Sequence, residues 1–206
     1  RFTRHGPVLF EDSLRHTAVA LRAAWLEVGG APYLASLRID QATNWAQFRT
    51  ALTYARMPAL NWVWGDTSGA IGWQAAGVAP VRPNWDGLVP VAGDGRYEWR
   101  GFLPIAQLPH VGSPEVSAFG TANAFNVPAG YPHVNAVART WAEPWRLRRL
   151  TEVLDTVRGA TVGSMARLQH DETPVAARTL VPLLRDIALT GDVARAARDS
   201  LLAWNG

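Results

Sequence analysis

The chain has 206 residues, of which 48% are hydrophobic and 18% are charged, a composition typical of a folded globular protein. All 20 basic residues are Arg, so an isoelectric point of about 9.9 overstates a net charge of only +3, and the scattered Arg residues argue against a nucleic-acid-binding surface. Cys is absent, which excludes disulfides and thiol chemistry, and no apolar run approaches the roughly 20 residues that cross a membrane.

The start of the chain has no targeting pattern. No basic segment followed by an apolar one opens it, and its first residue is Arg1 rather than Met. We therefore expect no signal peptide here. We also expect the chain to be a segment of a longer polypeptide.

Residues 1–56 predict a short strand-like start, an apolar segment and then a helix. A strand-like start leads into an apolar segment from Ala18 to Leu26. Thr43 or Asn44 can cap a helix from Trp45 to about Arg56, because Asn and Thr side chains accept hydrogen bonds from the first helical N–H groups.

A β-hairpin is the clearest signal that follows. The runs Leu60–Trp64 and Ala70–Gln74 are rich in aromatic or apolar residues, and Asp66–Gly69 supplies turn residues between them. Residues 77–112 hold many of the Gly and Pro residues and predict a long ordered loop. The aromatic side chains expected to pin this loop are Trp85, Tyr97, Trp99 and Phe102. Val116–Val127 is then predicted to form a strand.

The last third of the chain is helical in pattern. Pro144 suits the first turn of a helix in which Leu residues recur at helical spacing until Gly159. Thr161 and Thr173 start two further helices, and Asp192 caps a fourth that runs to Trp204. Strands before helices indicate an α+β fold. We expect one domain over 1–206, with a mixed strand and loop part at 1–143 and a helical part at 144–206.

Several blocks, in order along the whole chain, resemble the middle of the large β chain of the penicillin acylase family of N-terminal-nucleophile hydrolases. The Gly93-Asp94-Gly95-Arg96-Tyr97-Glu98-Trp99 stretch is the most specific of them. The blocks are Thr3–Val8, Asn61–Gly72, Leu88–Pro104, Thr121–Asn123, Tyr131-Pro132 and Trp141–Arg146. The fold implied by the resemblance is part of a four-layer αββα sandwich.

The resemblance also implies a reaction. A precursor is processed to expose a Ser at the start of the large chain, which works beside a small α chain from the same precursor. That Ser uses its own α-amine as the base, attacks an N-acyl amide bond, and forms an acyl-enzyme that water hydrolyses. The implied substrates are penicillins or cephalosporins, acyl-homoserine lactones or acylated lipopeptides. A periplasmic or secreted location is implied as well.

Two residues match positions that take part in the family's reaction. Asn123 matches the family's Asn whose side-chain amide donates to the oxyanion, and Arg146 matches the family's Arg that supports the Asn and the active-site amine. Taken alone, Asn123 also reads as a structural hydrogen-bonding residue, and Arg146 as a solvated Arg at a helix start. A cation in the first turn is disfavoured by the helix dipole, which favours a specific partner for Arg146.

Further expectations are weaker in pattern. Leu60 resembles a position that lines the acyl pocket and reads equally well as core. The resemblance implies no cofactor for catalysis, but it does imply a structural calcium ion. Gly87 could offer a carbonyl oxygen to that ion, and Asn135 a side-chain oxygen. Val134 stands at a matching position but cannot bind calcium through its side chain. The five His residues show no metal-ligand spacing. Carboxylate pairs at Asp94 and Glu98, or Asp171 and Glu172, read as solvated loop or helix-start residues.

The nucleophile is expected upstream, outside this chain. Arg1 is not a nucleophile, and Ser113 and Ser164 follow Gly residues inside blocks through which the resemblance runs without a break. The sequence therefore predicts the oxyanion-stabilising part of an amidohydrolase, inactive by itself. The alternative is a non-catalytic homologue or scaffold chain that binds an acylated ligand or a partner chain. The residue at the processing junction would distinguish the two.

Overall fold

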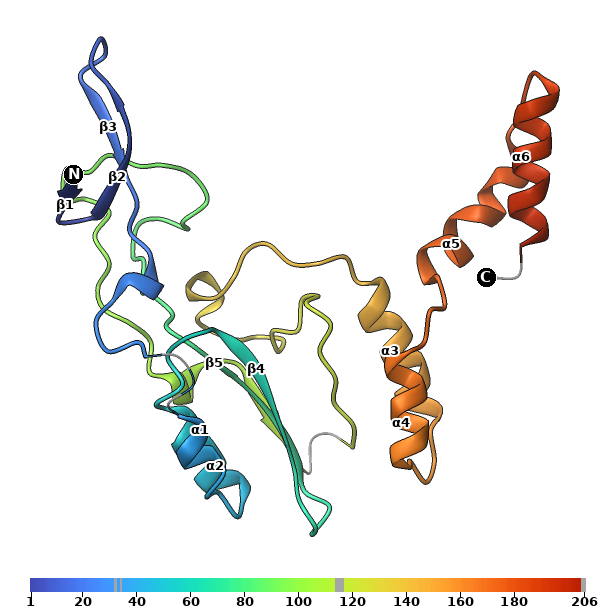
Figure 1. Ribbon diagram of the computed structural model, residues 1–206, viewed down its shortest axis with the longest axis horizontal. Helices are drawn as coiled ribbons and strands as arrows, with labels where there is room; N and C mark the ends of the chain where they lie inside the picture. The colour runs from blue at the N-terminus through green and yellow to red at the C-terminus, as the bar shows by residue number, and fades with distance from the viewer. Residues whose placement is uncertain (32, 34, 114–116, 205–206) are drawn as a thin grey trace. The chain divides into compact units, whose positions relative to one another are not determined.

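The computed structural model describes residues 1–206 except 32, 34, 114–116, 205 and 206. The described chain divides into two compact units, and each is treated by itself. Unit 1 comprises Arg1–Phe119 and Val127–Thr140, and unit 2 comprises Gly120–Asn126 and Trp141–Gly206. Every strand of the described chain lies in unit 1 and the helices α3 to α6 lie in unit 2, as Figure 1 shows. This order confirms the prediction of an α+β chain with strands early and helices late.

Unit 1 begins with a small antiparallel sheet in the order β1-β2-β3. Its strands are Phe2–Thr3, Gly6–Asp12 and Thr17–Ala20. A 3-10 turn, η1, follows at Ala24–Leu26, so the predicted apolar segment is divided between β3 and η1. Gly6 has φ +113°, and a Cβ there would lie 2.1 Å from the carbonyl oxygen of Leu21, which shows why this position needs Gly.

The second sheet of unit 1 contains the predicted hairpin, in the order β4-β5-β6. The strands are β4 (Leu60–Gly65), β5 (Ile71–Ala76) and β6 (His110–Gly112), all antiparallel. Asp66 organises the turn, because its Oδ1 accepts hydrogen bonds from the N–H groups of Ser68 and Ala70. The hairpin prediction is confirmed, with register Leu60↔Ala76 to Gly65↔Ile71.

The core of unit 1 forms where helix α2 (Trp45–Leu52) packs on this sheet, after a single helical turn, α1 (Ser36–Ile39). The Trp45 ring lies against two strand glycines: a Cβ on Gly72 would approach it to 2.8 Å, and one on Gly112 to 2.9 Å. The buried cluster comprises Ala35, Phe48, Leu52, Ala55, Ala76, Ala79, Ile105 and Leu108. The sheet and α2 therefore share one hydrophobic core (Figure 1).

Two expected elements end differently in the structure. Asn44 caps α2 as predicted, accepting from the N–H of Gln47 at 2.9 Å, but the helix ends at Leu52 rather than near Arg56. Its last turn tightens into i to i−3 bonds, and Pro58 disfavours helical backbone at the residue before it. The loop expected over 77–112 extends only to Pro104, because 3-10 turn η2 (Ile105–Gln107) and strand β6 follow.

The strand predicted over Val116–Val127 is wrong for the residues that the structure describes; Val116 itself lies outside them. Residues 117–127 form neither strand nor helix. Asn123 has φ +62°, a left-handed conformation that an extended strand cannot contain. The Asn123 carbonyl accepts from the N–H of Ala142 at 2.9 Å, so this backbone bonds outside any strand ladder.

Unit 2 has four α-helices and a 3-10 helix in the described chain, and a further 3-10 turn, η3 (Val134–Ala136), lies in unit 1. The unit 2 elements are α3 (Trp145–Thr156), α4 (Val162–Gln169), α5 (Val175–Leu180), η4 (Val181–Asp186) and α6 (Asp192–Ala203). Thr161 caps α4 through a capping box with Ser164, as the sequence predicts. The third predicted helix is divided into α5 and η4 at Pro182, and Gly191 rather than Asp192 occupies the N-cap of α6. None of the helices in the described ranges is long and apolar enough to span a bilayer.

Candidate active site

Asn123 is held against α3 by the short segment Gly120–Asn126. A Cβ on Gly120 would lie 2.2 Å from Cδ2 of Leu150, so the segment packs closely on this side chain of the helix, and a larger residue at position 120 would require Leu150 to shift. Phe125 packs edge-on against Trp141, with ring centroids 5.3 Å apart. These contacts, with the Ala142 to Asn123 backbone bond, fix Asn123 beside the first turn of α3.

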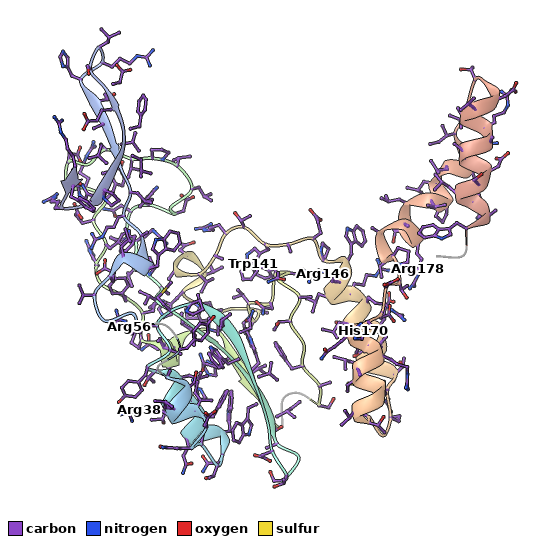
Figure 2. All side chains as sticks on the ribbon, in the orientation of Figure 1. Arg38, Arg56, Trp141, Arg146, His170 and Arg178 are labelled. Carbon is purple, nitrogen blue, oxygen red and sulfur yellow. The ribbon has the colours of Figure 1, made fainter. Side chains whose placement is uncertain are left out.

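Arg146 is the partner of Asn123. Its Nη2 donates to Asn123 Oδ1 at 2.9 Å, and both residues are exposed. Figure 2 labels Arg146 at the start of α3 and Trp141 on the segment that precedes it. The structure thus brings together the two residues that the sequence predicts for the chemistry, although they are 23 positions apart.

This hydrogen bond also determines which way the amide faces. A guanidinium is a donor only, so the atom of Asn123 that meets Arg146 must be the oxygen. The Nδ2 group then points away from the arginine with its two N–H donors. The pair therefore presents neutral donors at an exposed position, with a fixed positive charge immediately behind them.

Leu60 lies in unit 1, at the first residue of β4, where it pairs with Ala76. Its side chain is 41% exposed, so it belongs to the surface of the sheet rather than to the buried cluster. An exposed apolar side chain at a strand start can form part of a pocket wall, and its role in acyl binding stays a prediction.

The two expected calcium ligands lie in a positively charged part of unit 1. Arg82 lies against Gly87: a Cβ there would be 3.2 Å from Arg82 Nε. Asn135 Oδ1 already accepts a hydrogen bond from Arg139. Burial lowers the pKa of Arg82 and the charge of Arg139 lowers it further, whereas Asp86 raises it. In the described part of the chain, no group of three His, Asp or Glu residues could hold a metal ion. The residues present do not fit calcium, which needs several free oxygens.

Glu98 has a structural role that the sequence does not reveal. Its carboxylate accepts from His5 Nε2 at 2.7 Å, from Arg4 at 2.8 Å and from Arg22 at 3.2 Å. The hydrogen bond from His5 lowers the pKa of Glu98 below its usual value. Asp94 binds Arg96 instead, at 2.7 Å. Each of these carboxylates is therefore paired with cations, and Glu98 connects the loop after β5 to the first sheet.

An open pocket of about 500 Å³ lies beside this cluster, lined by β2, β3 and loop residues 87–93.

Comparisons with known proteins agree with this picture. The sequence model of the family described as penicillin amidase matches residues 1–206. The chain is 30% identical over 206 residues to the penicillin acylase 2 proenzyme of Pseudomonas sp. (strain SE83), covering 99% of this chain and 26% of the proenzyme. It is 34% identical over 143 residues to acyl-homoserine lactone acylase QuiP of Pseudomonas fluorescens (strain Pf0-1), covering 69% of this chain and 17% of that protein.

A solved structure is similar as well. The thermostable penicillin G acylase from Alcaligenes faecalis superposes with a TM-score of 0.77 at 26% identity. The match covers 98% of this chain and 37% of that one. The chain thus spans about a quarter of the length of the proenzyme and just over a third of the solved chain.

Proposed function

Because this chain belongs to the penicillin amidase family, we propose that its parent protein hydrolyses an N-acyl amide bond through an acyl-enzyme on an N-terminal Ser outside these 206 residues. The observation that carries the proposal is the 2.9 Å hydrogen bond from Arg146 to Asn123. It orients the Asn123 amide so that its N–H donors are available to a ligand. Such fixed donors are what a developing oxyanion requires.

In the proposed reaction the α-amine of the Ser takes the hydroxyl proton as Oγ attacks the acyl carbonyl. The C–O bond forms, and negative charge develops on the carbonyl oxygen, where Asn123 Nδ2 donates. The C–N bond then breaks, the proton passes to the departing amine, and water hydrolyses the ester. Arg146 does not touch the substrate in this scheme, so it acts as a positioning residue through Oδ1. No cofactor takes part.

The proposed substrate class is an amide with an apolar acyl group. Leu60 supports it, because an apolar side chain that is 41% exposed can contribute to an acyl pocket in the complete protein. The relatives are named as a penicillin acylase and an acyl-homoserine lactone acylase, and acylated lipopeptides are a third candidate. We propose these three as the substrates to test.

The proposal extends to the assembly. The similar solved structure supports a four-layer αββα fold to which this chain contributes strands and helices. A small α chain cut from the same precursor is the proposed partner, in line with the name proenzyme of one relative. We place the mature protein in the periplasm or outside the cell.

The test uses the full-length parent, purified after processing, with N-acyl substrates of the three classes. Asn123→Ala should lower kcat/KM by about 100- to 1,000-fold with little change in Tm. Asn123→Gly should do the same, and it fits the left-handed backbone at φ +62°, so it separates loss of the amide from backbone strain. Gln41→Ala, which removes an exposed amide in unit 1, is the control and should remain near wild-type activity.

Two results would contradict the proposal. Near-normal turnover in both Asn123 variants would remove this residue from the oxyanion role. An inert residue at the processed end of the large chain, together with no hydrolysis of any substrate, would favour the non-catalytic homologue instead.

A further inference from the structure

Arg82 is a half-buried cation with one buried donor that is unpaired among the described residues. Its guanidinium carbon lies 5.7 Å from the centroid of the Trp85 ring and 5.5 Å from that of Trp99, within cation–π range of both. Among the residues that the structure describes, its buried Nε has no hydrogen-bond partner. A buried donor that belongs to a charged group is costly to leave unpaired, so this arrangement points to a partner that these residues do not supply.

Neighbouring residues hold the Arg82 side chain in a defined position. Gly87 has φ +86°, and its missing Cβ leaves the space in which Arg82 Nε and Cζ lie. Trp85 is fixed by a hydrogen bond from its Nε1 to the Val89 carbonyl at 3.0 Å. The cation–π contact with this fixed ring favours one position of the guanidinium. The side chain is therefore held in place before any ligand arrives.

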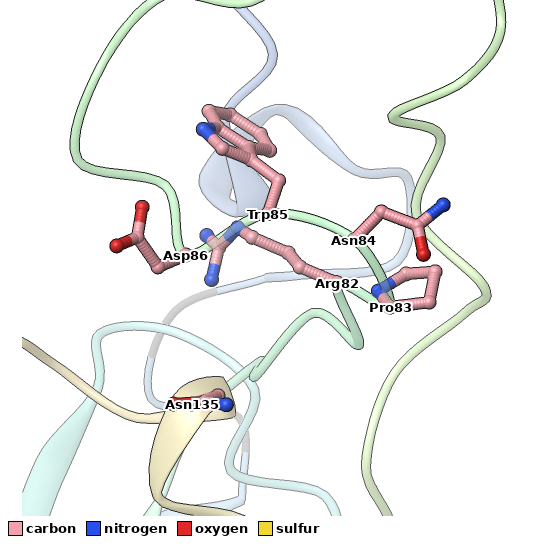
Figure 3. A pocket seen from close by; sticks show the side chains of 6 residues that line it. All are labelled: Arg82, Pro83, Asn84, Trp85, Asp86 and Asn135. Atoms are coloured by element: carbon pink, nitrogen blue, oxygen red, sulfur yellow. The ribbon is translucent and has the colours of Figure 1, made fainter.

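An open pocket of about 380 Å³ adjoins this side chain, as Figure 3 shows. Its lining residues are Arg82, Pro83, Asn84, Trp85, Asp86 and Asn135. A second cation, Arg139, donates a hydrogen bond to Asn135 Oδ1 at the edge of this pocket, and its charge lowers the pKa of Arg82. Among the residues that the structure describes, Asp86 is the carboxylate whose charge opposes that of Arg82, whereas Arg139 adds a second positive charge, so the local balance is about one positive charge. That balance favours a singly charged anion over a phosphate dianion or a metal cation.

We propose that Arg82 anchors a carboxylate-binding site, at the position where the family resemblance led us to expect calcium. A carboxylate matches the guanidinium fork with two parallel hydrogen bonds. Two sources share this chemistry: an Asp or Glu side chain from the part of the parent protein outside these 206 residues, and a free small carboxylate. The site is independent of Asn123 and Arg146, so it can be tested without reference to amide hydrolysis.

The test measures the Tm of the full-length parent. Acetate is titrated against chloride at constant ionic strength, for wild type, Arg82→Met and the control Arg100→Met, which removes the same charge at an exposed position. If a protein side chain fills the site, Arg82→Met lowers Tm by at least about 3 °C more than Arg100→Met, and acetate has no effect on wild type. If a free carboxylate fills it, acetate raises the wild-type Tm in a saturable way that Arg82→Met abolishes.

Three results would overturn the proposal. In the first, Arg82→Met matches Arg100→Met and acetate acts no differently from chloride. In the second, Asp86→Asn reproduces the loss seen in Arg82→Met, which would make Asp86 the partner. In the third, calcium raises the wild-type Tm and chelation lowers it. If Arg82→Met does not fold, Arg82→Lys replaces it, because Lys keeps the charge but loses the two parallel N–H donors of the guanidinium. A protein side chain in the site then predicts a lower Tm for Arg82→Lys. A free carboxylate in the site predicts that the acetate concentration at half-maximal stabilisation rises about tenfold.

Discussion

Asn123 combines two properties that few residues share. Its backbone is left-handed, at φ +62°, and its amide offers both an acceptor and donors. Gly would adopt the backbone without the amide, and Gln would carry the amide with a higher backbone cost. The hydrogen bond from Arg146 uses the acceptor, which leaves the donors for a ligand. Backbone and side-chain requirements therefore both select Asn at this position.

Arg146→Met should lower kcat in the full-length parent by about 100-fold with little change in KM. The reason is that the Asn123 amide would lose the charged donor that orients it, and small displacements of a catalytic group lower the rate strongly. Arg146→Lys should recover part of the rate, since Lys can still donate to Oδ1. The measurement is steady-state kinetics of each variant on the best substrate found for wild type.

The matched control for this prediction is Arg148→Met, an Arg on the same helix that pairs with Glu152. It should leave kcat within about twofold, because exposed pairs contribute little. Equal losses in the two variants, or no rescue by Lys, would show that Arg146 serves only the stability of α3.

Residue types at the candidate site could be predicted from the sequence, but their geometry could not. Asn123 and Arg146 are found through the motifs around them, whereas the left-handed turn at Asn123 is hidden, because a run of small and β-branched residues also suits a strand. The Glu98 cluster was missed for a different reason. Its partner His5 lies 93 positions away, and no local pattern reports such a contact.

At the scale of elements, local chemistry was the reliable guide. Asn44 and Thr161 cap their helices as predicted, since an N-cap depends only on residues within three positions. The turn at Asp66 is predicted correctly for the same reason. The ends of α2 and α5 were harder to place, because they depend on where a Pro interrupts and on what the last turn packs against.

The contact between α3 and the segment before α5 predicts a pH dependence. Arg149 donates to both carboxylate oxygens of Asp171, at 3.0 Å and 2.7 Å, and these bonds hold the pKa of Asp171 well below its usual range. A carboxyl whose pKa is depressed on folding stabilises the fold above its unfolded pKa of about 3.9. That stabilisation is lost as the pH falls through the lower folded pKa.

Asp171→Asn should therefore weaken the protection of α3 and α4 amides from hydrogen exchange by about 1 kcal/mol at pH 7, in the full-length parent. The difference from wild type should shrink as the pH falls below about 4. Asp155→Asn, which changes an exposed carboxylate on α3, should leave the protection unchanged. A variant that matches wild type at pH 7 would remove the Asp171 pair from the stability of unit 2.

For the molecule as a whole, the two units differ in how much they bury. Unit 1 has a contiguous buried cluster, whereas α3, α4 and α6 of unit 2 bury no described residue completely, and α5 buries Val175. Large apolar side chains of unit 2 are exposed, including Val162 at 91% and Val193 at 85%. Exposed apolar surface of this extent is typical of a face that another part of a protein covers.

The 206-residue chain expressed alone should lack amidase activity, because the proposed nucleophile lies outside it. Its exposed apolar side chains also predict that it unfolds without a single cooperative transition. Its exposed apolar surface should bind a dye such as ANS more strongly than the full-length parent does. Calorimetry and dye titration, with the parent as the reference, measure both effects. One sharp transition with a full calorimetric enthalpy would show that these units need nothing further to be stable.

The Trp45 ring limits which residues positions 72 and 112 can accept during evolution. The indole occupies the space that a Cβ on either glycine would need, so a change at one position alone is penalised. A smaller residue at 45 would remove that penalty and permit a side chain at 72 or 112. Across homologues, these three positions should covary as a group although they are up to 67 positions apart in the chain.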